Sequence, residues 1–242
     1  MKKVFSLLLV FMMILPFACA LGEEETGAQM PAVGDRFYFG RWEQDNVEEN
    51  GYEPLEWVVL DCEEDRLFLQ TVLCIEVARF YDQRVRMYWG ISPLRTWMNG
   101  EWLEQLFTAE EQSCILTTTV KNANPHGIKG AGADTEDKLY LLSRDECLAY
   151  YPTLESRVAW PTQRCIDQGC TLSKTTGSTR WWLRTPGARE MDVQGVRIDG
   201  RITAYGMQDV DWPTNCLRPV MWVQWSDEMA QLITLSGEGA GE

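Results

Sequence analysis

The chain has 242 residues, a formal net charge of −14 and 45% hydrophobic residues, which is the composition of a globular protein. This length allows one large domain with a substantial core that needs neither a metal nor a disulfide to stabilise it. The acidic balance repels nucleic acid and anionic lipid, and no Lys/Arg-rich run offsets it, so the sequence argues against a nucleic-acid partner.

The first twenty residues have the pattern of a secretory signal peptide. Two lysines precede an apolar run, and Ala18-Cys19-Ala20 ends that run in a small-x-small cleavage pattern. We expect cleavage after Ala20, a secreted or cell-envelope protein, and no membrane span in the mature chain. Losing the two lysines changes the formal charge from −14 to −16. Lipoprotein attachment at Cys19 and an uncleaved anchor are less favoured alternatives.

Flexible segments are predicted on both sides of a single domain. Residues 21–32 and 236–242 are acidic, contain glycine and show no periodicity. This composition predicts a flexible tether at 21–32 and a flexible tail at 236–242. The intervening residues 33–235 contain no internal repeat and no sign of a second hydrophobic core. One folded domain is therefore expected.

The domain begins with strand patterns and continues with helix patterns. Runs rich in β-branched and aromatic residues predict an opening antiparallel meander, with strands at 36–42, 56–61 and 66–70. Helix starts are indicated by N-cap residues followed by a proline or by a capping box: Ser92, Thr108 and Ser143. A long Gly- and Asn-rich loop separates the last two of these, and the LYLLS run at 139–143 predicts a buried strand.

Strand patterns return after residue 179. RWWLR at 180–184 is followed by two segments of alternating apolar and polar residues on either side of Asp199-Gly200. This pattern predicts a hairpin with a two-residue turn. A last strand is expected at about 220–225. Strands at both ends with helices between them predict an α+β domain with a mixed, mainly antiparallel sheet, short helices and long loops.

Several blocks of this sequence resemble a known bacterial family. The order GDRFYFGRW, EPLEWVVLD, SPLRTWMNGEWLEQLFTAEEQSCIL, TEDKLYLLSRDE, RWWLRTPG and CLRPVMWV is similar to the domain-of-unknown-function family numbered 6273. Thr185 stands where that family's pattern has a serine, and Asn215-Cys216-Leu217 precedes Arg218-Pro219 without a glycine-valine pair. The layout is more distantly similar to the C-type-lectin-like and formylglycine-generating-enzyme scaffold, which implies an architecture and no chemistry.

The RWWLR segment is the most informative one, because alternation in a strand sends its two tryptophans to opposite faces. Trp181 shares a face with Leu183, and we expect both in the core. Trp182 shares the other face with Arg180 and Arg184. It is either a packing residue with Arg184 stacked on its ring or part of a ligand-facing surface.

The other candidate binding residues are arginines next to aromatic residues or prolines in the sequence: Arg95, Arg180, Arg184 and Arg218. A planar guanidinium is suited to clamp a loop to the core through carboxylates or carbonyls. Recognition of an anion is the alternative. With Trp182, these arginines form the candidate ligand-binding set.

The sequence favours a non-catalytic protein without a cofactor or metal. The only histidine is His126, so a zinc site with two or three histidines is impossible, and a solvated loop histidine is expected. Asp134, Glu136 and Asp137 cluster after the glycine-rich loop, but their spacing is not that of an EF-hand, and ordinary hydrogen bonding is favoured.

Seven cysteines remain after the leader, so they cannot all pair within one chain. They lie at 62, 74, 114, 147, 165, 170 and 216. Cys62 and Cys74 are expected to act as small buried hydrophobic residues. Cys165 and Cys170 are close enough in sequence for a local bridge in an oxidising compartment, with free thiols as an equal alternative.

These features favour a non-catalytic recognition domain at the cell surface, with a glycan or an envelope protein as partner. Eleven tryptophans and long loops support this hypothesis. One alternative is a hydrolase with two carboxyls about 5–9 Å apart across a pocket. The other is a structural interaction module, in which Trp182, Arg184 and Arg218 would be buried and packed together.

Overall fold

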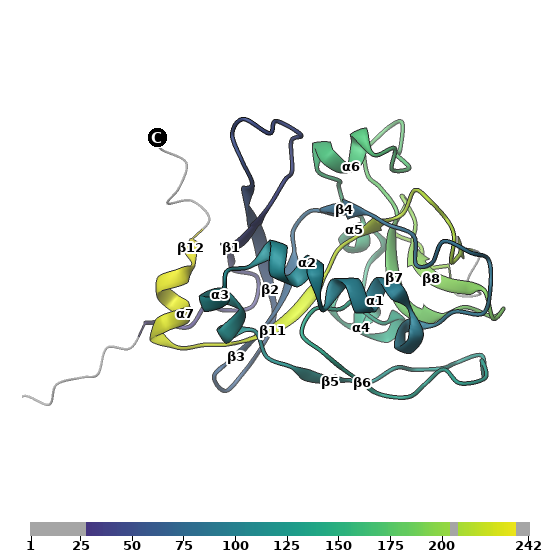
Figure 1. Ribbon diagram of the computed structural model, residues 1–242, viewed down its shortest axis with the longest axis horizontal. Helices are drawn as coiled ribbons and strands as arrows, with labels where there is room; N and C mark the ends of the chain where they lie inside the picture. The colour runs from purple at the N-terminus through teal and green to yellow at the C-terminus, as the bar shows by residue number, and fades with distance from the viewer. Residues whose placement is uncertain (1–27, 204–207, 236–242) are drawn as a thin grey trace, which may run out of the picture.

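The computed structural model describes residues 28–203 and 208–235, and it has the expected α+β architecture (Figure 1). The proposed leader, most of the tether and the tail lie outside the described residues. Residues 28–32, the end of the predicted tether, contact the fold: Trp225 Nε1 donates to Ala28 O at 3.1 Å, and Met30 packs on the core. No helix within the described ranges is long and apolar enough to cross a membrane.

The predicted meander forms one half of the molecule. β1 (Arg36–Trp42), β2 (Glu53–Glu63) and β3 (Arg66–Thr71) pair antiparallel in sequence order. Two strands from the far end of the chain extend this sheet: β11 (Val220–Gln224) pairs with β3, and β12 (Thr234–Leu235) pairs with β1. The sheet order β11-β3-β2-β1-β12 therefore brings the two ends of the domain together, as Figure 1 shows.

A second sheet carries the RWWLR segment. Its strands are β4 (Glu76–Val77), β7 (Trp181–Pro186), β8 (Asp192–Val196), β9 (Gln208–Asp209) and β10 (Cys216–Leu217). Their order is β4-β10-β7-β8-β9, and all pairs are antiparallel except β10 with β7. Because β7 lies in the middle of this sheet and both of its faces are covered, every residue of β7 is buried. A two-stranded hairpin, β5 (Thr118–Val120) with β6 (Thr135–Asp137), completes the strands of the described ranges.

Short helices connect and cover the two sheets (Figure 1). They are α1 (Pro93–Met98), α2 (Glu101–Leu106), α3 (Ala109–Cys114), α4 (Arg144–Tyr150), α5 (Leu154–Arg157), α6 (Gln163–Asp167) and α7 (Asp227–Leu232), with a 3₁₀ turn at Trp89–Ile91. The three predicted starts are confirmed: Ser92 accepts the N–H of Arg95, and the capping boxes at Thr108 and Ser143 are complete.

Two local predictions differ from the structure. Residues 139–143 are buried but do not form a strand, because only Tyr140 bridges to Val220. At Asp199-Gly200 the chain does turn, but the turn is longer than two residues. Gly200 N donates to Arg197 O at 2.9 Å, and Arg197 N donates to Arg201 O at 2.8 Å.

Tryptophan dominates the interior. The largest fully buried side chains are Trp57, Trp89, Trp102, Trp181 and Trp182. Each such ring removes roughly 200 Å² from water, worth about 5 kcal/mol as an upper bound. The N–H groups of all of these except Trp102 also find partners: Trp57 Nε1, for example, donates to Phe39 O at 2.7 Å. The buried rings therefore tie backbone segments together as well as filling volume.

Candidate functional site

Both tryptophans of RWWLR belong to the core. Trp181 and Leu183 are buried as predicted, and Trp182 is also 0% exposed. Trp182 Nε1 donates to Ala78 O at 2.8 Å, and its ring packs edge-on against Phe80 at 5.7 Å. Trp182 therefore offers no ring face to a ligand, and its adjacency to Trp181 serves packing on both sides of β7.

Arg184 clamps loops to the core. Its Nη1 and Nη2 donate to the two carboxylate oxygens of Glu146, and Nη2 also donates to Lys121 O at 2.9 Å. Arg184 is 2% exposed, and its guanidinium lies 5.5 Å from the ring centroid of Tyr140. Of the two alternatives for Trp182, packing is the one observed, but the ring beside the Arg184 guanidinium is that of Tyr140.

Arg95 makes a similar clamp on the β5–β6 hairpin. Its Nε donates to Asp137 Oδ1 at 2.5 Å, and its Nη2 donates to Glu136 O at 3.0 Å. Asp137 is 1% exposed and also accepts the indole N–H of Trp89 at 2.9 Å. This acidic residue of the predicted carboxylate cluster thus makes ordinary hydrogen bonds, as the sequence favoured, and Arg95 has a structural partner.

Arg180 lies just before β7 and is half-buried, with its guanidinium 5.9 Å from the ring centroid of Trp212. Burial, followed by the charge of Arg197, lowers the pKa of Arg180. Its Nε is buried without a hydrogen-bond partner. The four candidate arginines and Trp182 therefore have separate contacts and do not converge on one site.

Arg218 is the candidate that borders a pocket. It is 6% exposed and lies between the rings of Tyr151 and Trp181, with its guanidinium carbon 5.1 and 5.5 Å from their centroids. Its Nε donates to Thr71 O at 2.9 Å, whereas its Nη1 is buried without a hydrogen-bond partner. A buried cationic donor without an acceptor costs folding free energy. Arg218 is therefore the candidate that combines an unpartnered donor with a place on the wall of a pocket.

The pocket beside it, here called the Arg218 pocket, has a volume of about 560 Å³. It lies between the start of β1, the middle of β2, the segment after β3 and the segment from α4 to residue 160. Its lining combines apolar and aromatic side chains with a few charges: Val33, Gly34, Arg36, Val58, Val59, Leu60, Val72, Leu73, Tyr150, Tyr151, Glu155, Ser156, Val158, Trp160 and Arg218.

Three aromatic residues define the character of this pocket. Trp160 is 48% exposed, and its indole N–H donates to Thr176 O at 3.0 Å, which fixes the ring at the rim. Tyr151 donates its hydroxyl to Gln70 Oε1 at 2.6 Å, and burial raises its pKa although Arg218 opposes this. Tyr150 donates to Asp61 Oδ2 at 3.1 Å, and burial likewise raises its pKa. The pocket thus combines fixed rings with the cationic groups of Arg36 and Arg218.

A second groove, of about 510 Å³, lies beside α1 and α2. Trp97 borders it with one ring face stacked on Trp102, at 4.6 Å between centroids. Two of its charged side chains are paired with each other: Glu76 accepts Arg164 Nε at 2.9 Å, and it also accepts Trp42 Nε1 at 3.1 Å. Arg79 and Glu101 line this groove as well.

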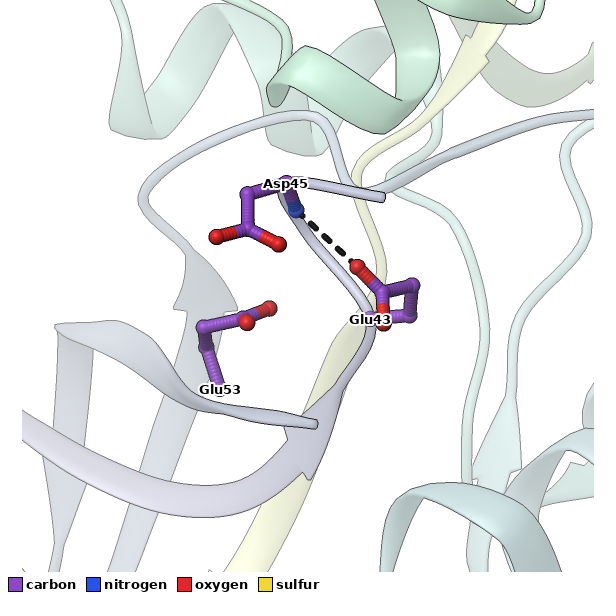
Figure 2. A group of neighbouring side chains, drawn as sticks. All are labelled: Glu43, Asp45 and Glu53. Carbon is purple, nitrogen blue, oxygen red and sulfur yellow. Dashed lines mark hydrogen bonds between the residues drawn. The ribbon is translucent and has the colours of Figure 1, made fainter. Parts of the chain in front are cut away.

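Three carboxylates meet beside the loop that joins β1 to β2: Glu43 and Asp45 belong to the loop, and Glu53 begins β2. One oxygen of each lies within 4.8 Å of the other two (Figure 2). Backbone N–H groups explain the cluster. Glu43 Oε1 accepts the N–H of Asp45 at 3.2 Å, and Glu53 Oε2 accepts the N–H of Gln44 at 2.6 Å. The pKa of Asp45 is lowered mainly by the hydrogen bond that its carboxylate accepts from the N–H of Val47. These bonds hold the acids together, and we assign no cation to them.

Sequence reasoning did not identify the aromatic residues of the Arg218 pocket. Trp160 precedes a proline in VAWPT, and Tyr150-Tyr151 precede a proline in AYYP. A large aromatic residue before a proline, at the end of a helix or in a loop, was the available signal. His126 lies in the loop between β5 and β6, outside the pocket.

A family model for a domain of unknown function, DUF6273, matches residues 64–225, about two thirds of the chain. No curated protein and no solved structure matches the chain. The C-type-lectin-like and formylglycine-generating-enzyme scaffolds therefore have no structural match to support them. The family expected from the sequence blocks is confirmed: the chain belongs to the DUF6273 family of domains of unknown function.

Proposed function

We propose that this chain is a non-catalytic recognition domain that binds a carboxylate-bearing glycan in the Arg218 pocket. One observation carries the proposal: Arg218 borders a pocket of about 560 Å³ and holds a buried Nη1 without an acceptor. A ligand carboxylate accepts two parallel N–H groups from a guanidinium, which is the strongest pairing available to arginine.

The remaining lining supports a sugar as the body of this ligand. Trp160 presents an exposed ring at the rim, suited to stack on the C–H face of a sugar ring. Arg36, Glu155 and Ser156 supply donors and acceptors at the same pocket, as sugar hydroxyls require. Arg36 adds N–H donors to the lining, and its positive charge is paired with Glu56, with 3.8 Å between Nη1 and Oε2.

The burial of Trp182, Arg184 and Arg218 supports a structural role for the RWWLR strand. These residues are buried, but they pack against different partners and not against one another. A purely structural module accounts for Trp182 and Arg184, since their polar atoms have partners. It does not account for the unpartnered Nη1 of Arg218, which is why we favour recognition.

Location at the cell surface belongs to this proposal and rests on the leader-like pattern at residues 1–20, which lies outside the described residues. A C-type-lectin-like scaffold likewise stays a prediction from the sequence resemblance alone. The glycan proposal depends on the pocket and needs neither of these to hold.

The experiment is calorimetric titration with an oligosaccharide of hexuronic acids and with the same oligosaccharide after reduction of its carboxyls to alcohols. We expect the acidic form to bind at least tenfold more tightly. Arg218→Met should abolish this preference. Trp160→Ala should weaken both ligands without destabilising the fold, because that ring is 48% exposed.

Trp97→Ala is the matched control, since it removes a tryptophan from the other groove. Equal affinity for the two oligosaccharides would contradict the proposal, and so would loss of binding in Trp97→Ala alone. Binding of an envelope protein that depends on Trp160 would favour a protein partner instead. The hydrolase hypothesis would be favoured if the purified chain cleaved the bound oligosaccharide and if Glu155→Gln abolished the cleavage.

A further inference from the structure

Four cysteines from distant parts of the chain meet at one place beside the second sheet. Cys216 lies on β10, and its Sγ lies 3.4 Å from Thr179 Oγ1, which also donates to Thr171 O at 2.9 Å, next to Cys170. The thiols of Cys170 and Cys216 each shift the pKa of the other. The backbone holds them there: Cys165 Sγ donates to Cys74 O at 3.4 Å, and Cys170 N donates to Cys165 O at 3.0 Å. All seven cysteines in the described ranges are reduced.

A metal centre is not the natural interpretation of this cluster. A tetrahedral thiolate site brings every sulfur close to every other sulfur around one ion. In the described part of the chain, one group of three possible metal ligands has all of its ligand atoms within 4.8 Å of one another, and it consists of Glu43, Asp45 and Glu53. No three of the sulfurs of Cys74, Cys165, Cys170 and Cys216 meet this condition. Such an arrangement suits pairwise chemistry between Cys216 and one partner.

Cys170 is the reactive partner in this cluster. It is 8% exposed, whereas Cys74, Cys165 and Cys216 are each 0% exposed. The hydrogen bond from Cys216 is the foremost cause that lowers the pKa of Cys170 to about 7. Hydrogen bonds from its three neighbours, together with burial, raise the pKa of Cys216. Near neutral pH the more accessible sulfur is thus substantially thiolate, the nucleophilic form, while the buried sulfur keeps its proton.

We propose that Cys170 and Cys216 are a redox-active pair that closes into a disulfide by exchange with a small-molecule disulfide such as oxidised glutathione. The Cys170 thiolate attacks one sulfur of that disulfide, forms a mixed disulfide and releases one glutathione thiolate. Cys216 then loses its proton and attacks the Cys170 sulfur, and the second glutathione leaves as a thiolate. Two protein thiols are oxidised, and one glutathione disulfide is reduced to two thiols.

The bond would join β10 to the loop after α6, across 46 residues of sequence. It differs from the local bridge between Cys165 and Cys170 that the sequence spacing suggests. Cys165 and Cys216 are both fully buried, but the Cys165 thiol donates to Cys74 O, whereas the Cys216 sulfur contacts Thr179 Oγ1, which also donates to the backbone next to Cys170. Cys216 is therefore the better partner for Cys170. This inference is independent of the glycan proposal.

The test uses the full chain, equilibrated with glutathione buffers of increasing oxidised fraction, followed by alkylation of free thiols and peptide mapping by mass spectrometry. Trypsin leaves Cys165 and Cys170 on one peptide, so a second protease that cleaves before Asp167 is needed to separate them. We expect two thiols to be lost together and the Cys170 peptide to be linked to the Cys216 peptide. Reduction should restore both thiols.

Three variants sharpen the result. Cys216→Ser should stop the reaction at a glutathione adduct on Cys170, and Cys170→Ser should leave the Cys216 thiol free. Cys114→Ser, which removes a buried cysteine of α3 outside the cluster, should behave like the wild type. The proposal is overturned if Cys170 and Cys216 both stay free throughout the series. A bond that joins Cys216 to Cys74 or Cys165, or that joins Cys165 to Cys170, overturns it too.

Discussion

Arg184 and Glu146 form a two-pronged ion pair, in which Nη1 and Nη2 of the arginine donate to separate oxygens of one carboxylate. The arginine is 2% exposed at its side chain and the glutamate 34%, so the pair lies at the edge of the core. Glu146 is also the third residue of α4, where its carboxylate accepts the N–H of Ser143 at 2.7 Å. One carboxylate therefore joins a helix start to the central strand β7.

Glu146→Gln should lower the free energy of unfolding by about 2–3 kcal/mol at pH 7, because it leaves the buried guanidinium without its counter-charge. This lies below the roughly 3–5 kcal/mol of a fully buried pair, since Glu146 is one-third exposed. Urea unfolding of the variant and the wild type measures this difference.

The same pair predicts a pH dependence. Burial raises the pKa of Glu146, but the hydrogen bond and charge of Arg184 outweigh it, so the pKa lies below its ordinary value. An unfolded glutamate takes up its proton near pH ~4.3, before the folded one does. The stabilisation is therefore complete above about pH 5 and is lost as the pH falls below ~4.3 toward the folded pKa. Unfolding curves of wild type and Glu146→Gln should converge over that interval, and a constant gap would contradict the assignment.

Trp182→Phe should destabilise the protein without affecting ligand binding. The variant removes ring volume from the core and leaves Ala78 O without its donor, a loss of about 2–3 kcal/mol. Trp212→Phe, at a half-buried ring whose N–H donates to Thr214 Oγ1, is the control and should cost less. Thermal unfolding compares the two, and a loss of oligosaccharide binding by folded Trp182→Phe would argue for a direct contact.

The two capping boxes should contribute different amounts to the free energy of unfolding. Thr108→Ala removes one cap from an exposed helix start, at a cost of about 1 kcal/mol. Ser143→Ala removes the equivalent cap at a residue that is 5% exposed, where Glu146 also holds Arg184. We expect about 2 kcal/mol for Ser143→Ala, measured by denaturant unfolding. Equal losses would show that Glu146 keeps its place without Ser143.

Gly200 and Gly51 form a matched pair for backbone strain, because each has φ +77°. A Cβ at Gly51 meets no atom within 4 Å, so Gly51→Ala should cost only the left-handed strain of about 1 kcal/mol. A Cβ at Gly200 would overlap the carbonyl oxygen of Leu154. Gly200→Ala should therefore lower the free energy of unfolding by at least about 2 kcal/mol more than Gly51→Ala. Similar melting temperatures for both variants would contradict this packing.

Local patterns in the sequence predicted the opening meander and the helix starts. The β1 boundaries match the expected run at 36–42, and the capping boxes form where their spacing places them. These features depend on residues that are close in sequence: side-chain alternation for a strand, and an N-cap with its third residue for a helix. The family was identified for the same reason, since the order of its blocks is a property of the sequence.

Only the tertiary structure decided which faces are covered. Alternation placed Trp181 and Trp182 on opposite faces of β7, but it could not show that neighbouring layers bury both faces. The same limit applies to Arg218 and Trp160, which border one pocket although 58 residues separate them, and to Cys170 and Cys216. Short-range physics fixes the direction of a side chain along its strand or helix. What it meets there depends on segments that only long-range packing brings alongside.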